Sequence, residues 1–129
     1  MKEQLNRVLV PVLLGDGADA LKIARRLHRR YGVLSHLYCT RPGLLTHFCS
    51  FVRIVRMPAF LQGELLCNDL RAFAMEYPDL MFCLIPCTEA FEHFCAAHAA
   101  DLEAYYVIVQ PEQIQKGALP YPYTEEVPV

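Results

Sequence analysis

The residues best placed to bind a ligand form a glycine turn near the start of the sequence. The segment GDGADA, residues 15–20, follows an apolar run and opens a helical pattern, which gives the GxGxxA arrangement. Glycines allow a tight turn, and a helix that begins there offers unpaired N–H groups to an anion. Asp16 and Asp19, however, place negative charge where a phosphate would rest, and either can cap the helix instead. The turn is therefore either a ligand loop or a plain strand-to-helix connection.

A second group of polar residues follows a later apolar run. Cys87, Thr88 and Glu89 come directly after Leu80–Ile85 and Pro86. Thr88 can cap the next helix, and Glu89 is favourably placed near the positive end of that helix. The same side chains can contact an amine or a hydroxyl group if they lie beside the glycine turn. Because a helix N-terminus can lower a thiol pKa, a nucleophilic Cys87 is a further alternative.

Two other patterns suggest chemistry less directly. The second apolar run ends in Cys39-Thr40-Arg41, without the acid that would bind a ribose hydroxyl. Arg41 can instead meet a 2′-phosphate, so NADP binding stays an alternative.

Five cysteines and histidines also imitate a metal cluster. Because the strand and helix expected to carry them direct their side chains differently, no metal site is predicted. They are Cys83, Cys87, His93, Cys95 and His98.

Strands and helices that alternate along the chain must position these residues. Apolar, β-branched runs bounded by Gly or Pro predict strands, and apolar residues at helical spacing predict helices. Such an alternation gives a parallel sheet with right-handed crossovers. We predict a Rossmann-like, three-layer α/β domain with about five strands in the order 3-2-1-4-5 and helices on both faces. The expected strands are Arg7–Leu14, Val33–Cys39, Phe51–Arg56, Leu80–Ile85 and Tyr105–Val109, and the expected helices are 18–31, 60–77 and one that begins after Thr88.

Proline and charge refine these predictions. Pro11 cannot donate to a ladder, so only Val12–Leu14 is expected to pair on both sides, with Pro11 at a strand start or a bulge. Two arginines place Phe51–Arg56 near the edge of the sheet. The first helix is expected to have an apolar face opposite a basic one. The apolar face comprises Leu21, Ala24, Leu27 or His28, and Tyr31, and the basic face comprises Lys22, Arg25, Arg26, Arg29 and Arg30.

The predicted strand order brings the two polar groups together. Crossovers from the first and fourth strands leave in opposite directions, so the loops at 15–17 and 86–89 flank the crevice where such folds bind ligands. The candidate binding residues are Gly15, Asp16, Gly17, Arg41, Cys87, Thr88 and Glu89.

Composition and charge bound the class of protein. The 129 residues suit one domain, expected over 1–111 with a Pro-rich linker or tail over 112–129, and no apolar run approaches the ~18 residues of a membrane helix. Six cysteines without a CxxC motif indicate reduced thiols and a cytoplasmic location.

Residues 1–60 carry a formal charge of +7 and residues 61–129 a charge of −9. Because the basic half lacks interleaved aromatics, no nucleic-acid partner is predicted, and the opposite charges suggest a homodimer or a partner chain.

Three segments together point to a family. They are PVLLGDGADALKIARRLHRRYGV (11–33), LMFCLIPCTEAFEHF (80–94) and LEAYYVIVQPE (102–112). Over most of residues 8–112 they resemble the pre-ATP-grasp domain of carboxylate-amine ligases of the ATP-grasp superfamily, the group that includes D-aspartate ligase-like proteins. The resemblance implies that residues 15–17 and 86–89 contribute to the substrate side of the active site.

In that family, the following domains clamp ATP and magnesium, an acyl phosphate forms on a carboxylate, and an amine attacks it. Residues 118–124 resemble the entry segment of the ATP-grasp domain. The resemblance therefore implies a truncated or free-standing domain without catalytic residues or a cofactor of its own. Its expected partners are a small-molecule amine or carboxylate and the missing ATP-grasp domain. Two alternatives stay open: a stand-alone nucleotide- or dinucleotide-binding protein that uses the GxGxxA turn, and a dimerisation module.

Overall fold

The computed structural model describes residues 9–15, 18–39, 50–57 and 63–115. Its five strands form one sheet in the order β3-β2-β1-β4-β5, and every neighbouring pair is parallel. The predicted order is confirmed, and the arginine-bearing strand β3 lies at an edge as expected. The strands are β1 (Leu9–Leu14), β2 (Ser35–Cys39), β3 (Val52–Arg56), β4 (Met81–Pro86) and β5 (Tyr106–Ile108).

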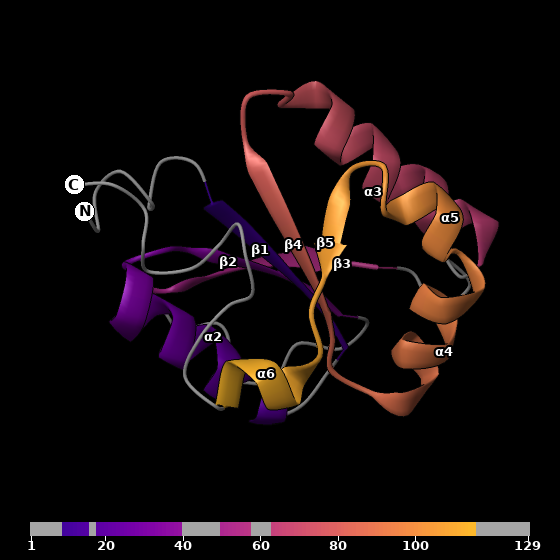
Figure 1. Ribbon diagram of the computed structural model, residues 1–129. Helices are drawn as coiled ribbons and strands as arrows, with labels where there is room; N and C mark the ends of the chain where they lie inside the picture. Colours follow the sequence, from indigo (N-terminus) through magenta and orange to yellow (C-terminus); the bar gives the residue numbers. More distant parts are fainter. Residues whose placement is uncertain (1–8, 16–17, 40–49, 58–62, 116–129) are drawn as a thin grey trace.

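Helices cover both faces of the sheet and complete three layers (Figure 1). On one face lie α2 (Ala18–Tyr31) and the short α6 (Pro111–Gln115). On the other lie α3 (Glu64–Glu76), α4 (Glu89–Ala97) and α5 (Ala99–Leu102). None of the helices in the described ranges is both long and apolar enough to span a membrane.

The central strand β1 contains a proline. It pairs with β4 over all 6 of its residues, whereas its ladder with β2 begins only at Val12. The prediction that only Val12–Leu14 pairs on both sides is therefore confirmed. Pro11 itself lies inside the strand, and not at its start as expected. Because proline has no N–H to donate, the ladder with β2 starts one residue after it.

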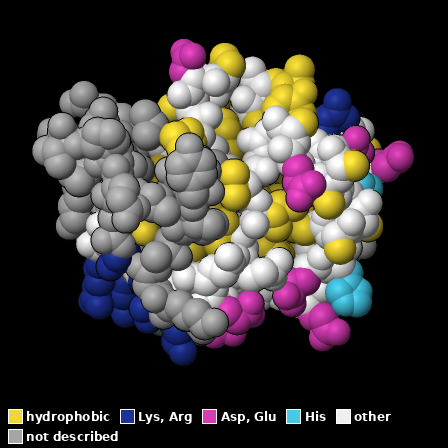
Figure 2. All heavy atoms as spheres, in the orientation of Figure 1, with side chains coloured by type: hydrophobic (Ala, Val, Ile, Leu, Met, Phe, Trp, Pro, Cys, Tyr) yellow, Lys and Arg dark blue, Asp and Glu magenta, His cyan; other side chains and the backbone are white. Residues whose placement is uncertain are grey.

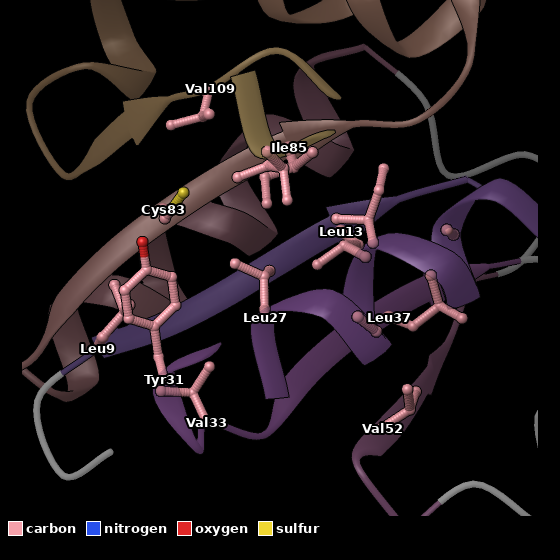
Figure 3. Packing of buried hydrophobic residues seen from close by; sticks show 14 of the residues in the cluster. Leu9, Leu13, Leu27, Tyr31, Val33, Leu37, Val52, Cys83, Ile85 and Val109 are labelled. Atoms are coloured by element: carbon pink, nitrogen blue, oxygen red, sulfur yellow. The ribbon is translucent and has the colours of Figure 1, made fainter. Parts of the chain in front are cut away.

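The core between the sheet and α2 is mainly aliphatic (Figure 3). Leu13 and Val33 are 0% exposed and Leu27 is 1% exposed. Helical spacing left Leu27 and His28 as alternatives for the buried face, and Leu27 is the buried one while His28 is exposed. The basic side chains of α2 face solvent, as predicted, and gather where α2 lies in Figure 2.

The core on the other face is rich in aromatic rings. The ring of Phe82 lies 5.3 Å from that of Phe73 and 5.6 Å from that of Tyr106, measured between centroids. The Tyr106 hydroxyl donates a hydrogen bond of 2.7 Å to the carbonyl oxygen of Leu70 in α3. This bond satisfies a buried polar group and ties β5 to α3.

The helix α6 lies where the sequence predicted the start of an unpacked tail. Pro111 occupies its first position, which suits proline because the N–H there needs no acceptor. The Gln113 side chain reaches back and accepts a 2.8 Å hydrogen bond from the Gln110 N–H, and Ile114 is 2% exposed against the α2 core. Residues 112–115, expected to begin an unpacked tail, are helical instead, because Pro111 starts a helix here. The remainder of the predicted tail lies outside the described residues.

Candidate functional site

The carboxyl ends of β1 and β4 lie side by side at the centre of the sheet. Since β2 flanks β1 and β5 flanks β4, the chain leaves these two strands in opposite directions, which defines the crevice of a doubly wound sheet. Gly15 follows β1, and its N–H donates to the Tyr38 oxygen at 2.9 Å. Cys87 follows β4, and its N–H donates to the Leu14 oxygen at 2.8 Å. The loop at 86–89 therefore begins beside the end of β1, next to Gly15.

Gly15 is required by local packing. Its φ of 130° lies in the region that residues with a side chain rarely adopt. A Cβ added there would lie 2.8 Å from Thr88 Cγ2 and 3.6 Å from both Cys87 Cβ and Phe91 Cδ2. The first glycine of the GxGxxA turn thus lets the β1–α2 connection touch the start of α4, and this role needs no ligand.

Thr88 caps α4, as the sequence predicted. Its backbone is extended, and Oγ1 accepts a 3.3 Å hydrogen bond from the Phe91 N–H. Glu89 begins the helix with an exposed carboxylate whose Oε1 lies 3.9 Å from His93 Nε2. Thr88 is therefore engaged in the fold, whereas the Glu89 side chain is accessible to a ligand at the crevice.

Cys87 does not have the properties of a nucleophile. Burial raises the pKa of its thiol to about 12; a hydrogen bond with the Leu14 backbone opposes the shift, and the nearby Asp19 adds to it. The thiol lies 3.5 Å from the Ile85 oxygen and can donate to it. A thiol that stays protonated at neutral pH is a poor nucleophile. The alternative of a pKa lowered by the helix N-terminus is therefore wrong, because burial outweighs the helix dipole.

Acidic residues surround the carboxyl edge of the sheet. Each helix that directly follows a strand, namely α2, α3, α4 and α6, has an acid in its first turn. Such acids stabilise the helix dipole, but they also give this edge a negative potential that disfavours phosphate and favours an ammonium group. Acidic side chains are visible along the lower edge of the molecule in Figure 2. The first-turn acids are Asp19, Glu64, Glu89, Glu92 and Glu112.

Some candidate residues lie outside the described part of the chain, and others were missed. Asp16, Gly17 and Arg41 are outside the described residues. Phe91 contacts the space beside Gly15, and Asp19 lies near enough to Cys87 to act on its thiol. Phe91 follows Thr88 by three residues, so helical spacing could have placed it at the crevice. The nearness of Asp19 to Cys87 depends on tertiary contacts that spacing does not reveal.

The cysteines that imitate a metal cluster are dispersed, as expected. Cys83 is fully buried in the core beside α2, whereas Cys95 belongs to the core on the opposite face of the sheet. Burial raises the pKa of both thiols, to about 12 for Cys95. These two residues therefore cannot share a metal ion.

The fold and the crevice define an α/β domain with a doubly wound parallel sheet. Among curated proteins, the chain is similar to a D-aspartate ligase of Enterococcus faecium (strain Aus0004), with 23% identity over 105 residues. This alignment covers 79% of the chain and 25% of the ligase, so the chain spans about a quarter of that relative's length. No family model and no solved structure matches the chain. The comparison supports a distant relation to a ligase.

Proposed function

We propose that this chain is the substrate-side domain of an ATP-grasp-type carboxylate-amine ligase and that it does not join a carboxylate to an amine by itself. The observation that carries the proposal is the similarity to D-aspartate ligase over 79% of the chain. The match covers a quarter of that enzyme, and on this proposal the ATP and magnesium sites would be supplied by other domains. The doubly wound sheet and its crevice agree with the resemblance of residues 11–33 and 80–94.

The acidic carboxyl edge favours the amine part of a substrate. Asp19 and Glu89 place exposed carboxylates in the first turns of the helices that follow β1 and β4. Exposed carboxylates attract an ammonium group and repel a phosphate over a screening length of roughly 8–10 Å. Each exposed ion pair stabilises binding only modestly. The isolated domain should therefore bind an amino acid with a Kd of about 1 mM, which corresponds to roughly 4 kcal/mol.

Phosphoryl transfer needs more cations than the crevice supplies. Catalysis of this step depends on bound divalent metal and on positive groups that neutralise the developing charge. The lysines of the chain are Lys2, Lys22 and Lys116. Lys22 is exposed on α2, and the other two lie outside the described residues. The chain is expected to release no phosphate from magnesium-ATP with any amino acid, and turnover by the purified chain would contradict the proposal.

Binding is tested by titration of isotope-labelled protein with D-aspartate, L-aspartate, succinate, magnesium-ATP and NADPH. Amide resonances of Gly15, Cys87 and Glu89 should shift with the amino acids at millimolar concentration. Glu89→Gln and Asp19→Asn should each weaken this binding about threefold, as expected for exposed ion pairs. Glu76→Gln, which removes an exposed acid at the far end of α3, is the matched control and should leave the Kd unchanged.

The same titration distinguishes the proposed ligase domain from a stand-alone nucleotide-binding protein. If NADPH or ATP shifts these amides at micromolar concentration while the amino acids do not, the GxGxxA turn is a nucleotide site and the proposal fails. A chimera in which this chain replaces the matched quarter of D-aspartate ligase gives an independent test. Ligase activity of the folded chimera with an amino-acid substrate supports the proposal.

A further inference from the structure

Three side chains of metal-binding type meet on the α3–α5 face of the sheet. Cys67 comes from the first half of α3, His98 joins α4 to α5, and Asp101 lies in α5. One potential ligand atom from each, a sulfur, a nitrogen and an oxygen, lies within 4.8 Å of the other two. None of the three belongs to the loops that form the crevice.

Local structure explains the convergence. The Asp101 N–H donates to the His98 oxygen at 3.1 Å, and the Leu102 N–H donates to the same oxygen at 3.0 Å. This turn places residues 98 and 101, three apart, on one side of the short helix. Leu102 is 0% exposed in the same core as Cys67, so its burial holds the turn against α3.

Two of the ligands are also held by their surroundings. Cys67 is 3% exposed, and its neighbours in the core restrict its position. The imidazole of His98 packs on the ring of Phe94, with centroids 4.9 Å apart and an interplanar angle of 41°. Asp101 is exposed, which gives an ion a path from solvent. A metal site with two fixed ligands and one mobile ligand loses little side-chain entropy when it closes.

The donor set indicates which ion fits. A thiolate, an imidazole and a carboxylate together match zinc, which accepts all three, whereas magnesium and calcium prefer oxygen ligands. Tetrahedral zinc with bonds of ~2.0–2.3 Å holds its ligand atoms roughly 3.3–3.8 Å apart. Because the three ligand atoms lie within 4.8 Å of one another, no pair needs to approach by more than about 1.5 Å to reach these separations.

Without a cation, the surroundings of Cys67 disfavour its thiolate form. Burial raises the pKa of the Cys67 thiol, and the carboxylate of Asp101 raises it further, whereas Arg71 acts in the opposite sense and Glu64 adds to the rise. The Asp101 carboxylate is thus close enough to repel a thiolate. A divalent cation between the two groups turns this repulsion into attraction.

We propose that Cys67, His98 and Asp101 bind a zinc ion, with a fourth position open to water. Zinc with three protein ligands and one exchangeable ligand is stable in proteins. The ion would fasten the first half of α3 to the α4–α5 junction. This site is independent of the crevice and of the proposed ligase role.

Cobalt(II) is the probe, because it occupies zinc sites and absorbs light when it binds a thiolate. Titration of the whole chain with cobalt should give a thiolate-to-metal charge-transfer band, which excess zinc removes. Cys67→Ser should abolish the band. Cys95→Ser, which changes another buried thiol in the same core, and Glu112→Gln, which removes an exposed acid on α6, are the matched controls and should keep it.

Asp101→Asn decides the question if Cys67→Ser does not fold. This exposed change keeps the side-chain shape and removes a charged ligand, so the Kd for zinc, measured by competition with a chelator, should rise at least ~10-fold. Zinc should also raise the unfolding temperature of the wild type more than that of Asp101→Asn. A wild-type chain without the charge-transfer band, a band that persists in folded Cys67→Ser, or an unchanged Kd in Asp101→Asn overturns the proposal.

Discussion

The two faces of the sheet are built from different side chains. Between the sheet and α2 the buried residues are almost all aliphatic, and among the described residues of this face Tyr31 is the one buried aromatic ring. On the α3–α5 face, Tyr38, Phe82 and Tyr106 are buried and further aromatic rings pack against them. The aromatic face also contains the Tyr106 hydrogen bond and the Cys67 cluster.

The two faces therefore contribute differently: the aliphatic face contributes mainly to stability, and the aromatic face also carries groups that can bind a ligand. Aliphatic side chains supply burial without polar groups that need partners. Aromatic rings with hydroxyl groups, and the thiol and imidazole beside them, require specific contacts but offer groups that can bind or titrate. The crevice lies where the faces meet, because Gly15 follows β1 and its loop touches Thr88 at the start of α4.

The largest expected effect is on the aliphatic face. Leu27→Ala removes a side chain that is 1% exposed and leaves a cavity lined by apolar side chains. We expect the free energy of unfolding to fall by about 4 kcal/mol, measured by urea denaturation. Leu34→Ala, at a position 36% exposed between α2 and β2, is the control and should change it by less than about 1 kcal/mol. Equal losses in the two variants would contradict the assigned core.

A substitution at the junction of the two faces should have the next largest effect. Gly15→Ala combines an unfavourable φ with the 2.8 Å approach to Thr88 Cγ2, and should destabilise the fold by about 3 kcal/mol. Gly63→Ala has a positive φ but nothing within 4 Å, so it should lose only about 1 kcal/mol. Adding Thr88→Ser to Gly15→Ala removes Cγ2, keeps the capping hydroxyl and should recover part of the loss. A double-mutant cycle without coupling would show that the contact is unimportant.

The outer side of α3 is expected to form a homodimer contact. Leu65 and Met75 are 54% and 58% exposed, and Tyr77 after the helix is 44% exposed. Such side chains mark an interface where they form a contiguous apolar patch. Light scattering should give twice the monomer mass at micromolar concentration, and Leu65→Lys should weaken the dimer about tenfold, or roughly 1.4 kcal/mol. A monomer mass for the wild type at that concentration would exclude this contact.

On the aromatic face, removal of a single hydroxyl tests the link between β5 and α3. Tyr106→Phe deletes the 2.7 Å hydrogen bond to the Leu70 oxygen without changing the ring. The free energy of unfolding should fall by about 1 kcal/mol. Tyr105→Phe, at the half-buried position one residue earlier, should leave it unchanged within error. A similar loss in both variants would mean that the buried bond contributes nothing specific.

The smallest expected effect is a dependence of stability on pH. Burial lowers the pKa of His36 from 6.5, and Arg53 lowers it further. Nδ1 of His36 is buried without a hydrogen-bond partner in the described ranges. Between the lowered pKa and 6.5 the unfolded chain binds more protons, so stability should fall as the pH decreases below 6.5. Between pH 7.5 and pH 5.5 the unfolding temperature of His36→Gln should fall less than that of the wild type. Equal falls would show that His36 does not cause the pH dependence.

Local patterns were sufficient to predict most of the fold. The helix α2 has the predicted bounds, Ala18–Tyr31, because its apolar and basic residues alternate at helical spacing before Gly32. The starts of β2, β3, β4 and β5 were placed one or two residues too early, since an apolar run does not show where a neighbouring strand begins to pair. The helix α6 was missed because Pro111 can either break a helix or begin one, and the burial of Ile114 against α2 selects the second.

The sites depend more on contacts between distant segments. Strand order alone predicted that the loops of Gly15 and Cys87 would lie side by side, as they do. It could not show that Thr88 leaves no space for a side chain at position 15, because that depends on a contact of 2.8 Å. Likewise, His98 was considered with the cysteines near it in sequence, whereas the structure places it beside Cys67. Which side of α3 faces α5 is determined by packing.

The proline in β1 has a consequence for synthesis of the chain. All pairs between β1 and β4 join residues roughly 70 positions apart, and such non-local pairing forms late. Until its neighbours have formed, β1 has both of its backbone edges available to other chains. Pro11 lies inside β1 and has no N–H to donate on the edge that β2 later covers. The residue that shortens the native pairing with β2 should therefore also limit intermolecular pairing along that edge of the nascent strand.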